Sequence, residues 1–510
     1  MKTRRILLLA IGVITTAMTL APSTLLAESR RPNIIFILTD DLDTEYPNGS
    51  WIDHFPRLKS LLADKGTTFK NFFVSLSLCC PSRTSMLRGQ YAHNTEIFTN
   101  AAPGGGFQKA HNLGLEESTF ATWLHDAGYR TVLIGKYLNG YPGNLGKEYI
   151  APGWEEWYSG ERRQYEQFDY DLNENGQIVS YGTDPEDYEQ DVFRAKAVDF
   201  IQRVAKHKKP FFMWMTTYSP HQPAIFAPRH ADAFPDVKAP RPPTFNQEDV
   251  SHQPSWVQNR PLLTNAQIAS LDALYRKRLQ SMLAVEDTVE AIIKTLRKTG
   301  QLHNTYIFFS SDNGFHLGQH RLPAGKNTEF EEDLHVPMIV RGPGVPRGRV
   351  LEHLALNIDF APTFAELAGV PVPDFVDGRS LVPLIRRHVP PVESWRQAFL
   401  IEHGFIQTGD VGRTPETASN DVEPPDPFDL AVAQPQMPQP FQGLHTKNLV
   451  YVNYLSTGEL ELYNLDDDPY EQTSIADTAD PDLVQQLAAW LDALRICARA
   501  SCRAAEDTPP

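Results

Sequence analysis

Two runs of apolar residues place the strongest limit on how this chain can fold. Residues 33–38 follow Pro32, and residues 306–311 form a similar run much later in the sequence. Both are apolar at successive positions, which is typical of parallel strands buried on both faces of a sheet. Further runs with the same character cover residues 129–134, 210–217 and 336–340. The sequence therefore predicts an α/β fold with a large, mostly parallel sheet flanked by helices.

Acidic and amide side chains follow each of the first two runs, residues 33–38 and residues 306–311. Asp40 and Asp41 come after the first, and Asp312 and Asn313 come after the second. Open α/β sheets bind ligands at the carboxyl ends of their strands, and neighbouring carboxylates repel each other unless a cation joins them. Either pair alone would be explained by a surface turn. Together they offer three carboxylates and one amide oxygen, which favours Ca²⁺ over Mg²⁺ or Mn²⁺.

The segment from Cys79 to Gly89 combines a reactive side chain, a helix start and a cation. Pro81 suits the first turn of a helix, and Gly89 suits its end. The helix N-terminus attracts an anion, and Arg83, one turn after Cys79, is expected to direct its guanidinium to the same place. Two adjacent cysteines are, on their own, more often small buried residues, and Cys80 is expected to pack in this way. The whole segment indicates a nucleophile at Cys79.

This segment resembles the sulfatase signature Cys-x-Pro-Ser-Arg-x-x-x-Leu-x-Gly. Every specified position matches: Cys79, Pro81, Ser82, Arg83, Leu87 and Gly89. The resemblance implies an alkaline-phosphatase-like fold and hydrolysis of sulfate esters. It also implies that a formylglycine-generating enzyme oxidises Cys79 to formylglycine (3-oxoalanine), whose hydrate is the nucleophile. In sulfatases the matching acids and amide bind calcium, so the implied ligands are Asp40, Asp41, Asp312 and Asn313, together with residue 79.

Further strand ends deliver single polar side chains to the same edge of the predicted sheet. Lys136 follows residues 129–134, and His221 follows residues 210–217. A solvated lysine and a structural histidine are the plain alternatives. By resemblance, Lys136 and Lys326 match sulfate-binding lysines, and His221 matches a histidine beside the scissile ester.

One position departs from the pattern of many sulfatases. They carry a catalytic histidine two residues after the first lysine, where this chain has Leu138, and Asn139 is the hydrogen-bond donor expected to replace it. His316 and His320 have no role of comparable definition. Either one of them contacts the sugar, for which His316 is the candidate, or both only pack and bond locally.

Three segments look most like N-acetylglucosamine-6-sulfatases and their bacterial relatives: residues 78–83, 135–139 and 311–320. The resemblance implies an enzyme that acts on a sulfated sugar or an aryl sulfate. Two alternatives stay open. One is a formylglycine enzyme of the same superfamily that cleaves phosphonate or phosphate esters. The other is a secreted glycan-binding protein in which Cys79 is never converted.

The N-terminal residues 1–27 are typical of a cleaved secretory signal. Lys2, Arg4 and Arg5 precede an apolar run over residues 6–20, with small residues near Ala27. A membrane anchor is the alternative, but the run is short and contains three threonines, so no stable membrane insertion is expected. The formal net charge is −16, which argues against general affinity for nucleic acid. Export to the periplasm or the extracellular space is predicted.

The chain length predicts two domains. Residues 30–390 are expected to form the catalytic domain and residues 391–510 a small C-terminal α+β domain. Within the latter, short strands are expected at 398–401, 449–455 and 459–463, an irregular segment at 408–442, and a last helix that starts at Pro481. A long helix is predicted over 267–298, with Glu286 and Asp287 on its solvated face.

Cys497 and Cys502 are the two remaining cysteines. A disulfide between them is plausible in an oxidising compartment. A free pair is the alternative, and a zinc site is not expected because no second pair of ligands follows.

Overall fold

The computed structural model describes residues 31–47, 49–404 and 439–509. The predicted signal segment 1–27 and most of the predicted irregular segment 408–442 lie outside the described residues. Residues 31–510 belong to one compact unit. A boundary near residue 390 therefore stays a prediction.

Among the described residues, the main sheet has ten strands in the order β13-β2-β12-β9-β1-β8-β4-β5-β6-β7. Their bounds are β1 (Asn33–Thr39), β2 (Thr67–Phe69), β4 (Arg130–Gly135), β5 (Glu156–Arg162), β6 (Asp171–Glu174), β7 (Gln177–Ser180), β8 (Phe211–Thr216), β9 (Thr305–Ser311), β12 (Met338–Arg341) and β13 (Arg349–Leu351). In the centre, β1 lies parallel to both β8 and β9, and β4 lies parallel to β8. β12 and the β5–β7 meander are antiparallel. The predicted large, mostly parallel sheet is confirmed, with antiparallel strands at its flanks.

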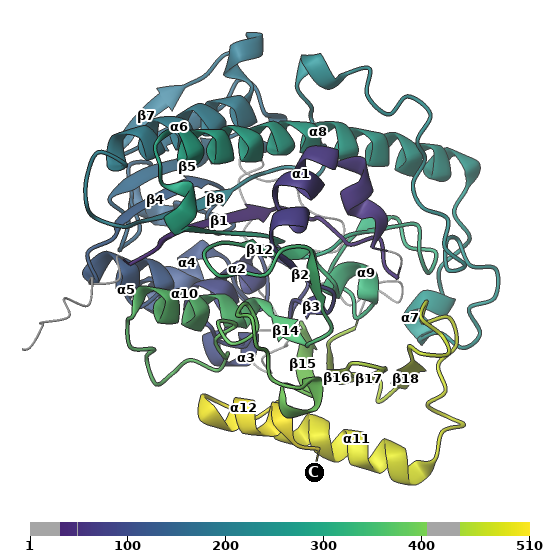
Figure 1. Ribbon diagram of the computed structural model, residues 1–510. Helices are drawn as coiled ribbons and strands as arrows, with labels where there is room; N and C mark the ends of the chain where they lie inside the picture. The colour runs from purple at the N-terminus through teal and green to yellow at the C-terminus, as the bar shows by residue number, and fades with distance from the viewer. Residues whose placement is uncertain (1–30, 48, 405–438, 510) are drawn as a thin grey trace, which may run out of the picture. The chain divides into compact units, whose positions relative to one another are not determined.

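The sheet is buried on both faces because alternate residues of β1 enter different cores. Ile34, Phe36 and Leu38 belong to one core, and Ile35 and Ile37 belong to the other. Figure 1 shows α6 and α8 covering one face, with α2, α5 and α10 on the other. The helices are α1 (Pro56–Leu61), α2 (Cys79–Arg88), α3 (Ala92–Thr95), α4 (Phe107–Asn112), α5 (Phe120–Asp126), α6 (Glu189–Val204), α7 (Ser255–Gln258), α8 (Asn265–Lys298), α9 (Glu331–Leu334), α10 (Phe360–Ala368), α11 (Pro481–Leu494) and α12 (Ala500–Asp507).

The predicted long helix is α8, which begins with a capping box between Thr264 and Gln267. The prediction that Glu286 faces solvent is wrong. Its side chain is 2% exposed and accepts hydrogen bonds from the backbone and guanidinium of Arg57 on α1. A buried carboxylate needs such partners, and an acidic residue on a helix facing another helix cannot be told from a solvated one by periodicity alone.

A second sheet follows residue 390. Its antiparallel strands run in the order β15 (Ala398–His403), β16 (Phe441–Thr446), β17 (Leu449–Tyr454) and β18 (Leu460–Asn464). Three of these strands were predicted. The prediction of an irregular segment up to residue 442 is wrong at its end, because residues 441 and 442 begin β16. Short two-residue pairings complete the structure: β3 (Phe72–Phe73) with β14 (Ala355–Leu356), and β10 (His316–Leu317) with β11 (Ala324–Gly325).

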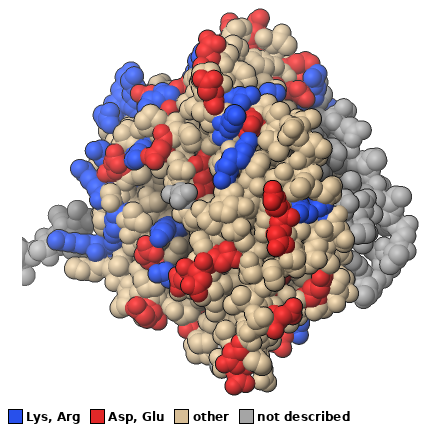
Figure 2. All heavy atoms as spheres, turned by 90° about the vertical axis from the view of Figure 1, so that its right-hand side faces the viewer, with Lys and Arg blue, Asp and Glu red and all other residues tan. Residues whose placement is uncertain are grey.

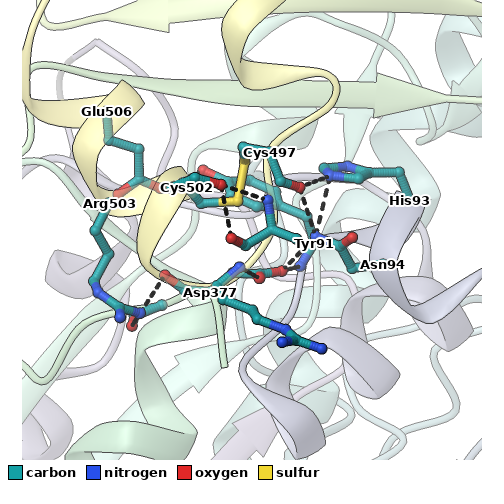
Figure 3. The surroundings of a disulfide bond; sticks show 12 residues. Tyr91, His93, Asn94, Asp377, Cys497, Cys502, Arg503 and Glu506 are labelled. Carbon is teal, nitrogen blue, oxygen red and sulfur yellow. Dashed lines mark hydrogen bonds between the residues drawn. A yellow bond between two sulfur atoms is a disulfide. The ribbon is translucent and has the colours of Figure 1, made fainter. Parts of the chain in front are cut away.

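The predicted disulfide between Cys497 and Cys502 is present (Figure 3). It closes the turn between α11 and α12, and this turn is tied to the rest of the protein. The Cys497 carbonyl oxygen accepts a hydrogen bond from Asn94 at 3.0 Å, and the Asp377 carboxylate accepts one from the backbone of Arg499. The turn that the disulfide closes is therefore tied to α3 and to the loop after α10.

In the part of the chain that the structure describes, no helix combines the length and the apolarity needed to cross a bilayer. Figure 2 shows one face of the molecule, on which acidic and basic side chains are interspersed over the described surface. With a net charge of −16, the protein offers no general attraction for an anionic ligand. Any such attraction must come from local cations.

Candidate active site

Cys79 is the first residue of α2, directly after Leu78 in extended conformation. Residues from Cys79 to Leu87 are all buried, and Gly89 ends the helix with a φ of 70°. A Cβ at Gly89 would lie 2.9 Å from the Val376 side chain, so the sequence needs glycine there for space as well as for conformation. Cys80 packs into the core, as predicted.

The two acidic pairs come together beside Cys79. β1 and β9 are neighbours in register, so Asp41 and Asp312 emerge at adjacent strand ends. The backbone N–H of Asp41 donates to Asp312 Oδ1 at 3.1 Å, and Asn313 Nδ2 donates to Asp41 Oδ1 at 2.8 Å. The Cys79 Sγ lies 3.6 Å from Asp40 Oδ1. Asp41 has a φ of 67°, a left-handed conformation that is uncommon outside glycine and is found most often at functional sites.

Two buried lysines neutralise the adjacent acids. Lys136, directly after β4, donates to Asp40 Oδ2 at 3.0 Å, and Lys326 donates to Asp41 Oδ1 at 2.7 Å. Lys326 Nζ also lies 2.8 Å from Cys79 Sγ. Burial alone would raise the pKa of both carboxyls, but the lysines and His221 outweigh it, so both pKa values lie below their usual range. The acids are therefore ionised at neutral pH.

Arg83 is part of the site and bonds mainly to its neighbours there. Its Nε donates to Asp312 Oδ2 at 2.7 Å, and its Nη1 donates to Thr216 Oγ1 and to the Lys136 carbonyl. The guanidinium is fully buried, and its Nη2 lies 4.0 Å from Asp40 Oδ1, which is the oxygen that lies 3.6 Å from Cys79 Sγ. Arg83 thus orients the acids and the start of the Lys136 loop on the side of the site where Cys79 lies.

His221 faces the same acids from the loop after β8. Its Nδ1 lies 2.6 Å from the Gln222 carbonyl oxygen and must donate to it, so Nε2 is the nitrogen that faces the site. Nε2 lies 3.6 Å from Asp41 Oδ2. The Tyr165 ring packs against the imidazole in a tilted arrangement, with ring centroids 4.4 Å apart and an interplanar angle of 47°, and the same ring lies 5.4 Å from Lys136 Nζ.

The acids and Asn313 fit a divalent cation because two of their oxygens have no hydrogen-bond partner in the described part of the chain. Among the described residues, Asp41 Oδ2 and Asn313 Oδ1 are buried and have no hydrogen-bond partner. Asp40, Asp41, Cys79 and His221 also place one donor atom each within 4.8 Å of one another. Both oxygens of Asp312 are occupied, by Arg83 and by backbone N–H groups. Asp312 therefore has fewer free lone pairs for a metal than Asp41 or Asn313.

Two predicted substrate-binding residues lie in neighbouring positions. Asn139 is 4% exposed and lines a small cavity together with Lys136, Tyr165 and Tyr218. His316 is 1% exposed, and its Nδ1 lies 2.9 Å from Asp333 Oδ1. Contact of either side chain with a sugar stays a prediction.

Two residues that shape the site were missed from the sequence. Tyr165 covers His221, and Arg278 on α8 donates to the Asp41 carbonyl oxygen at 2.5 Å. Tyr165 lies in an irregular segment with no recognisable motif. Arg278 sits on a long amphipathic helix, where an arginine that points inward looks like one that faces solvent.

The comparisons with known proteins agree with this geometry. The sulfatase family model matches residues 32–370. The chain is 35% identical over 487 residues to human N-acetylglucosamine-6-sulfatase, covering 94% of this chain and 87% of the relative. It is also 37% identical over 382 residues to the extracellular sulfatase SULF-1 homolog of Drosophila melanogaster, covering 74% of this chain and 33% of the relative.

Solved structures show the same fold. A protein in complex with its substrate D-glucosamine-2-N,6-O-disulfate superposes with a TM-score of 0.73 at 24% identity, covering 91% of this chain and 97% of that one. The phosphonate monoester hydrolase from Silicibacter pomeroyi superposes with a TM-score of 0.66 at 20% identity, covering 90% and 93%. At these identities both likenesses concern the fold. From the family match and the extent of its sequence relatives, the chain belongs to the sulfatase family and is a sulfuric ester hydrolase.

Proposed function

We propose that this protein hydrolyses sulfate monoesters on glycans, with 6-O-sulfated N-acetylglucosamine as the substrate class. The observation that carries the proposal is the convergence of Lys136 and Lys326 on acids that flank Cys79. The relatives named N-acetylglucosamine-6-sulfatase, which match over most of the chain, support the choice of sugar.

Lys136 and Lys326 are proposed to bind the sulfate group. Both ammonium groups are buried, where a charge interacts more strongly with an anion than it does in water. They would offset the negative charge that otherwise repels a nucleophile approaching sulfur. Arg83 is a positioning residue in this scheme, because it bonds to Asp312 and to the Lys136 carbonyl oxygen.

Residue 79 is proposed to work as formylglycine rather than as cysteine. Burial raises the pKa of the Cys79 thiol well above its usual range, even though Lys136 and Lys326 oppose the shift. The thiolate is the reactive form, so an unmodified Cys79 would be a poor nucleophile at neutral pH. Hydration of the aldehyde would supply two hydroxyls, one to attack sulfur and one whose deprotonation later expels sulfate. Because Cys79 is fully buried, the formylglycine-generating enzyme would have to act before the chain has folded.

His221 is proposed to protonate the departing sugar oxygen. A sugar alkoxide is a poor leaving group, and proton transfer in the transition state removes this difficulty. The bond of Nδ1 to the Gln222 carbonyl fixes the ring so that Nε2 faces the reacting centre. Asp41 Oδ2 lies 3.6 Å from Nε2 and helps to keep the ring at the reacting centre.

Asp40, Asp41, Asn313 and residue 79 are proposed to hold Ca²⁺, with Asp312 as a further ligand. When bound, the ion supplies positive charge that stabilises anionic oxygens of the substrate and of residue 79. Asp41 Oδ2 and Asn313 Oδ1 support this assignment, because buried oxygens without a partner are costly unless a ligand satisfies them.

Export is also proposed. It rests on the composition of residues 1–27 and on the disulfide between Cys497 and Cys502, which is typical of an oxidising compartment.

Mass spectrometry of the tryptic peptide of residues 71–83 tests the central step. The protein should be produced with and without a formylglycine-generating enzyme. We expect the aldehyde at residue 79 in active preparations, and activity in proportion to the converted fraction. Cys79→Ala is the matched control, which retains the fold and cannot be converted. Full activity of an unconverted preparation would contradict the proposal.

A substrate panel tests the reaction class. One aryl group presented as sulfate, phosphate diester and phosphonate separates a sulfatase from the alternative esterases of the superfamily. Hydrolysis of N-acetylglucosamine-6-sulfate, compared with sugars sulfated at other positions, tests the substrate class. Chelation followed by Ca²⁺ return tests the ion: we expect loss and recovery of activity, with no change in the converted fraction.

A further inference from the structure

A second group of metal-binding side chains lies outside the site around Cys79. It consists of His320, Glu332 and Glu471, which we call the His320 cluster. His320 follows β10, Glu332 lies on α9, and Glu471 lies in the loop after β18. All three side chains are buried, and one donor atom from each lies within 4.8 Å of the others.

Two of the three side chains, those of His320 and Glu471, have donor atoms without a partner within the described part of the protein. The His320 ring is 1% exposed, and neither of its nitrogens has a hydrogen-bond partner. One face of the ring stacks on Phe330 at 3.7 Å between centroids. Glu471 Oε2 accepts a hydrogen bond from the Glu331 backbone at 2.9 Å, but its Oε1 has no partner. Buried histidines almost always use at least one ring nitrogen, so this arrangement indicates a missing ligand.

The local charge points to a cation. The groups that act most strongly on Glu332 and Glu471 are other acids, including Glu331 and Asp333. Neither glutamate forms an ion pair with a Lys or Arg side chain among the described residues.

The two histidines near Glu331 do not neutralise Glu332 or Glu471, because both bond to Glu331. Its two oxygens are engaged by His335 at 3.0 Å and by His445 at 2.5 Å. In the described part of the chain, Glu332 and Glu471 of the His320 cluster therefore form no ion pair with a basic side chain.

We propose that His320, Glu332 and Glu471 bind a second divalent cation, with Zn²⁺ the best fit and Mn²⁺ the next. An imidazole nitrogen with two carboxylate oxygens is a donor set for these ions, whereas Ca²⁺ prefers oxygen ligands alone. In tetrahedral geometry, zinc bonds of about 2.0–2.2 Å place neighbouring ligand atoms about 3.3–3.6 Å apart. The side chains, whose donor atoms lie within 4.8 Å of one another, would have to close by up to about 1.5 Å to bind such an ion.

The ion would join segments that are far apart in the sequence. His320 and Glu332 come before residue 390, and Glu471 comes after it. The loop after β18 contacts the rest of the protein here, through the Glu471 carboxylate and through its carbonyl oxygen, which accepts from Gln253 at 2.7 Å. The second ion is thus a structural one that fastens this loop, and it is separate from the ion proposed for the sulfate site.

Metal content of the full-length protein tests the proposal. Wild type and the variants His320→Gln, Glu471→Gln and His353→Gln should be equilibrated with Zn²⁺ in excess Ca²⁺, so that calcium fills the sulfate site, and then dialysed. His353 is the matched control, a buried histidine that bonds to the Pro390 carbonyl oxygen. Zinc per chain is then measured by inductively coupled plasma mass spectrometry, and the melting temperature is recorded with and without a zinc chelator.

We expect one Zn²⁺ per chain in wild type and His353→Gln, and at least about tenfold less in the two cluster variants. Chelation should lower the melting temperature of wild type and leave the cluster variants unchanged. Equal zinc in all four proteins would overturn the proposal, as would no retained ion in wild type after refolding with Zn²⁺ or Mn²⁺. If the variants do not fold, anomalous diffraction from wild-type crystals at the zinc edge decides: a peak between His320 and Glu471 supports the site, and its absence refutes it.

Discussion

Replacement of His221 by asparagine separates its acid role from its structural role. The asparagine amide can still donate to the Gln222 carbonyl oxygen, which lies 2.6 Å from Nδ1 of the histidine. It has nothing at the position of Nε2. The variant therefore keeps the local fold and removes only the group proposed to protonate the leaving oxygen.

The size of the effect depends on the leaving group. General acid catalysis is worth about 10²–10⁴-fold, or about 3–5 kcal/mol of barrier. We expect this full loss in kcat/KM on a sugar sulfate, whose alkoxide needs the proton. An aryl sulfate with an acidic phenol leaves without help, so its loss should be small.

A second effect of the substitution is common to both substrates. His221 Nε2 lies 3.6 Å from Asp41 Oδ2, and the imidazole is one of the groups that lower the pKa of Asp41 against the effect of burial. Removal of the imidazole takes away this effect on the pKa of Asp41, and the loss is the same for both leaving groups. The ratio of the two kcat/KM values cancels this contribution and isolates proton transfer.

The assay measures kcat/KM for N-acetylglucosamine-6-sulfate and for an activated aryl sulfate in wild type, His221→Asn and Tyr165→Phe. Tyr165→Phe keeps the ring that packs against His221 and serves as the matched control. The converted fraction of residue 79 is measured in each preparation. If His221→Asn loses the same factor on both substrates, His221 is not the acid, and its role is confined to positioning Asp41.

Four further changes test other parts of the structure. Lys326→Met should reduce kcat on an aryl sulfate by about 10²–10³-fold, because a buried positive charge is lost beside residue 79, and kinetics corrected for the converted fraction would show it. Arg396→Met should destabilise the protein by about 3–5 kcal/mol in urea unfolding, because it leaves the fully buried Asp359 without its cation and leaves Glu506 with Arg379 alone. Replacing Cys497 and Cys502 by serine should cost about 2 kcal/mol in the same assay, since the disulfide closes only a short loop. Burial lowers the pKa of His93, but an adjacent carboxylate outweighs it and raises the pKa to about 9. This contribution to stability is complete below pH 6.5 and is lost as the pH rises through about 9, so His93→Gln should flatten stability over that range.

The residues at the strand ends of the site can be predicted from the sequence because each prediction depends only on the residue pattern of its own strand. A run buried on both faces identifies β1 and β9, and the acids that follow such strands must meet where the strands are neighbours. The same reasoning placed Lys136 and His221 at the correct edge. These predictions need only the periodicity of a strand and the rule that parallel strands end on one side.

The predictions failed where a side chain had a choice of partners. Arg83 was expected beside Cys79, but its bond to Asp312, which follows a strand more than two hundred positions later in the chain, was not predicted. Glu286 was expected in solvent, but it meets Arg57 across two helices. Long-range pairings of this kind leave no periodic signal, so the sequence identifies the groups of a site more reliably than it identifies their pairings.

The pairings explain how so many charges tolerate complete burial. Asp40, Asp41 and Asp312 each bond to one cation, namely Lys136, Lys326 and Arg83 in that order, and all three carboxylates are fully buried. Without these cations, burial would favour neutral acids that cannot bind a metal ion. Two of the three cations are also the lysines that the proposal assigns to sulfate, whereas Arg83 bonds to Asp312 and two backbone carbonyls. The lysines therefore have two tasks, and removal of either one should disturb the ionisation of an acid as well as the binding of substrate.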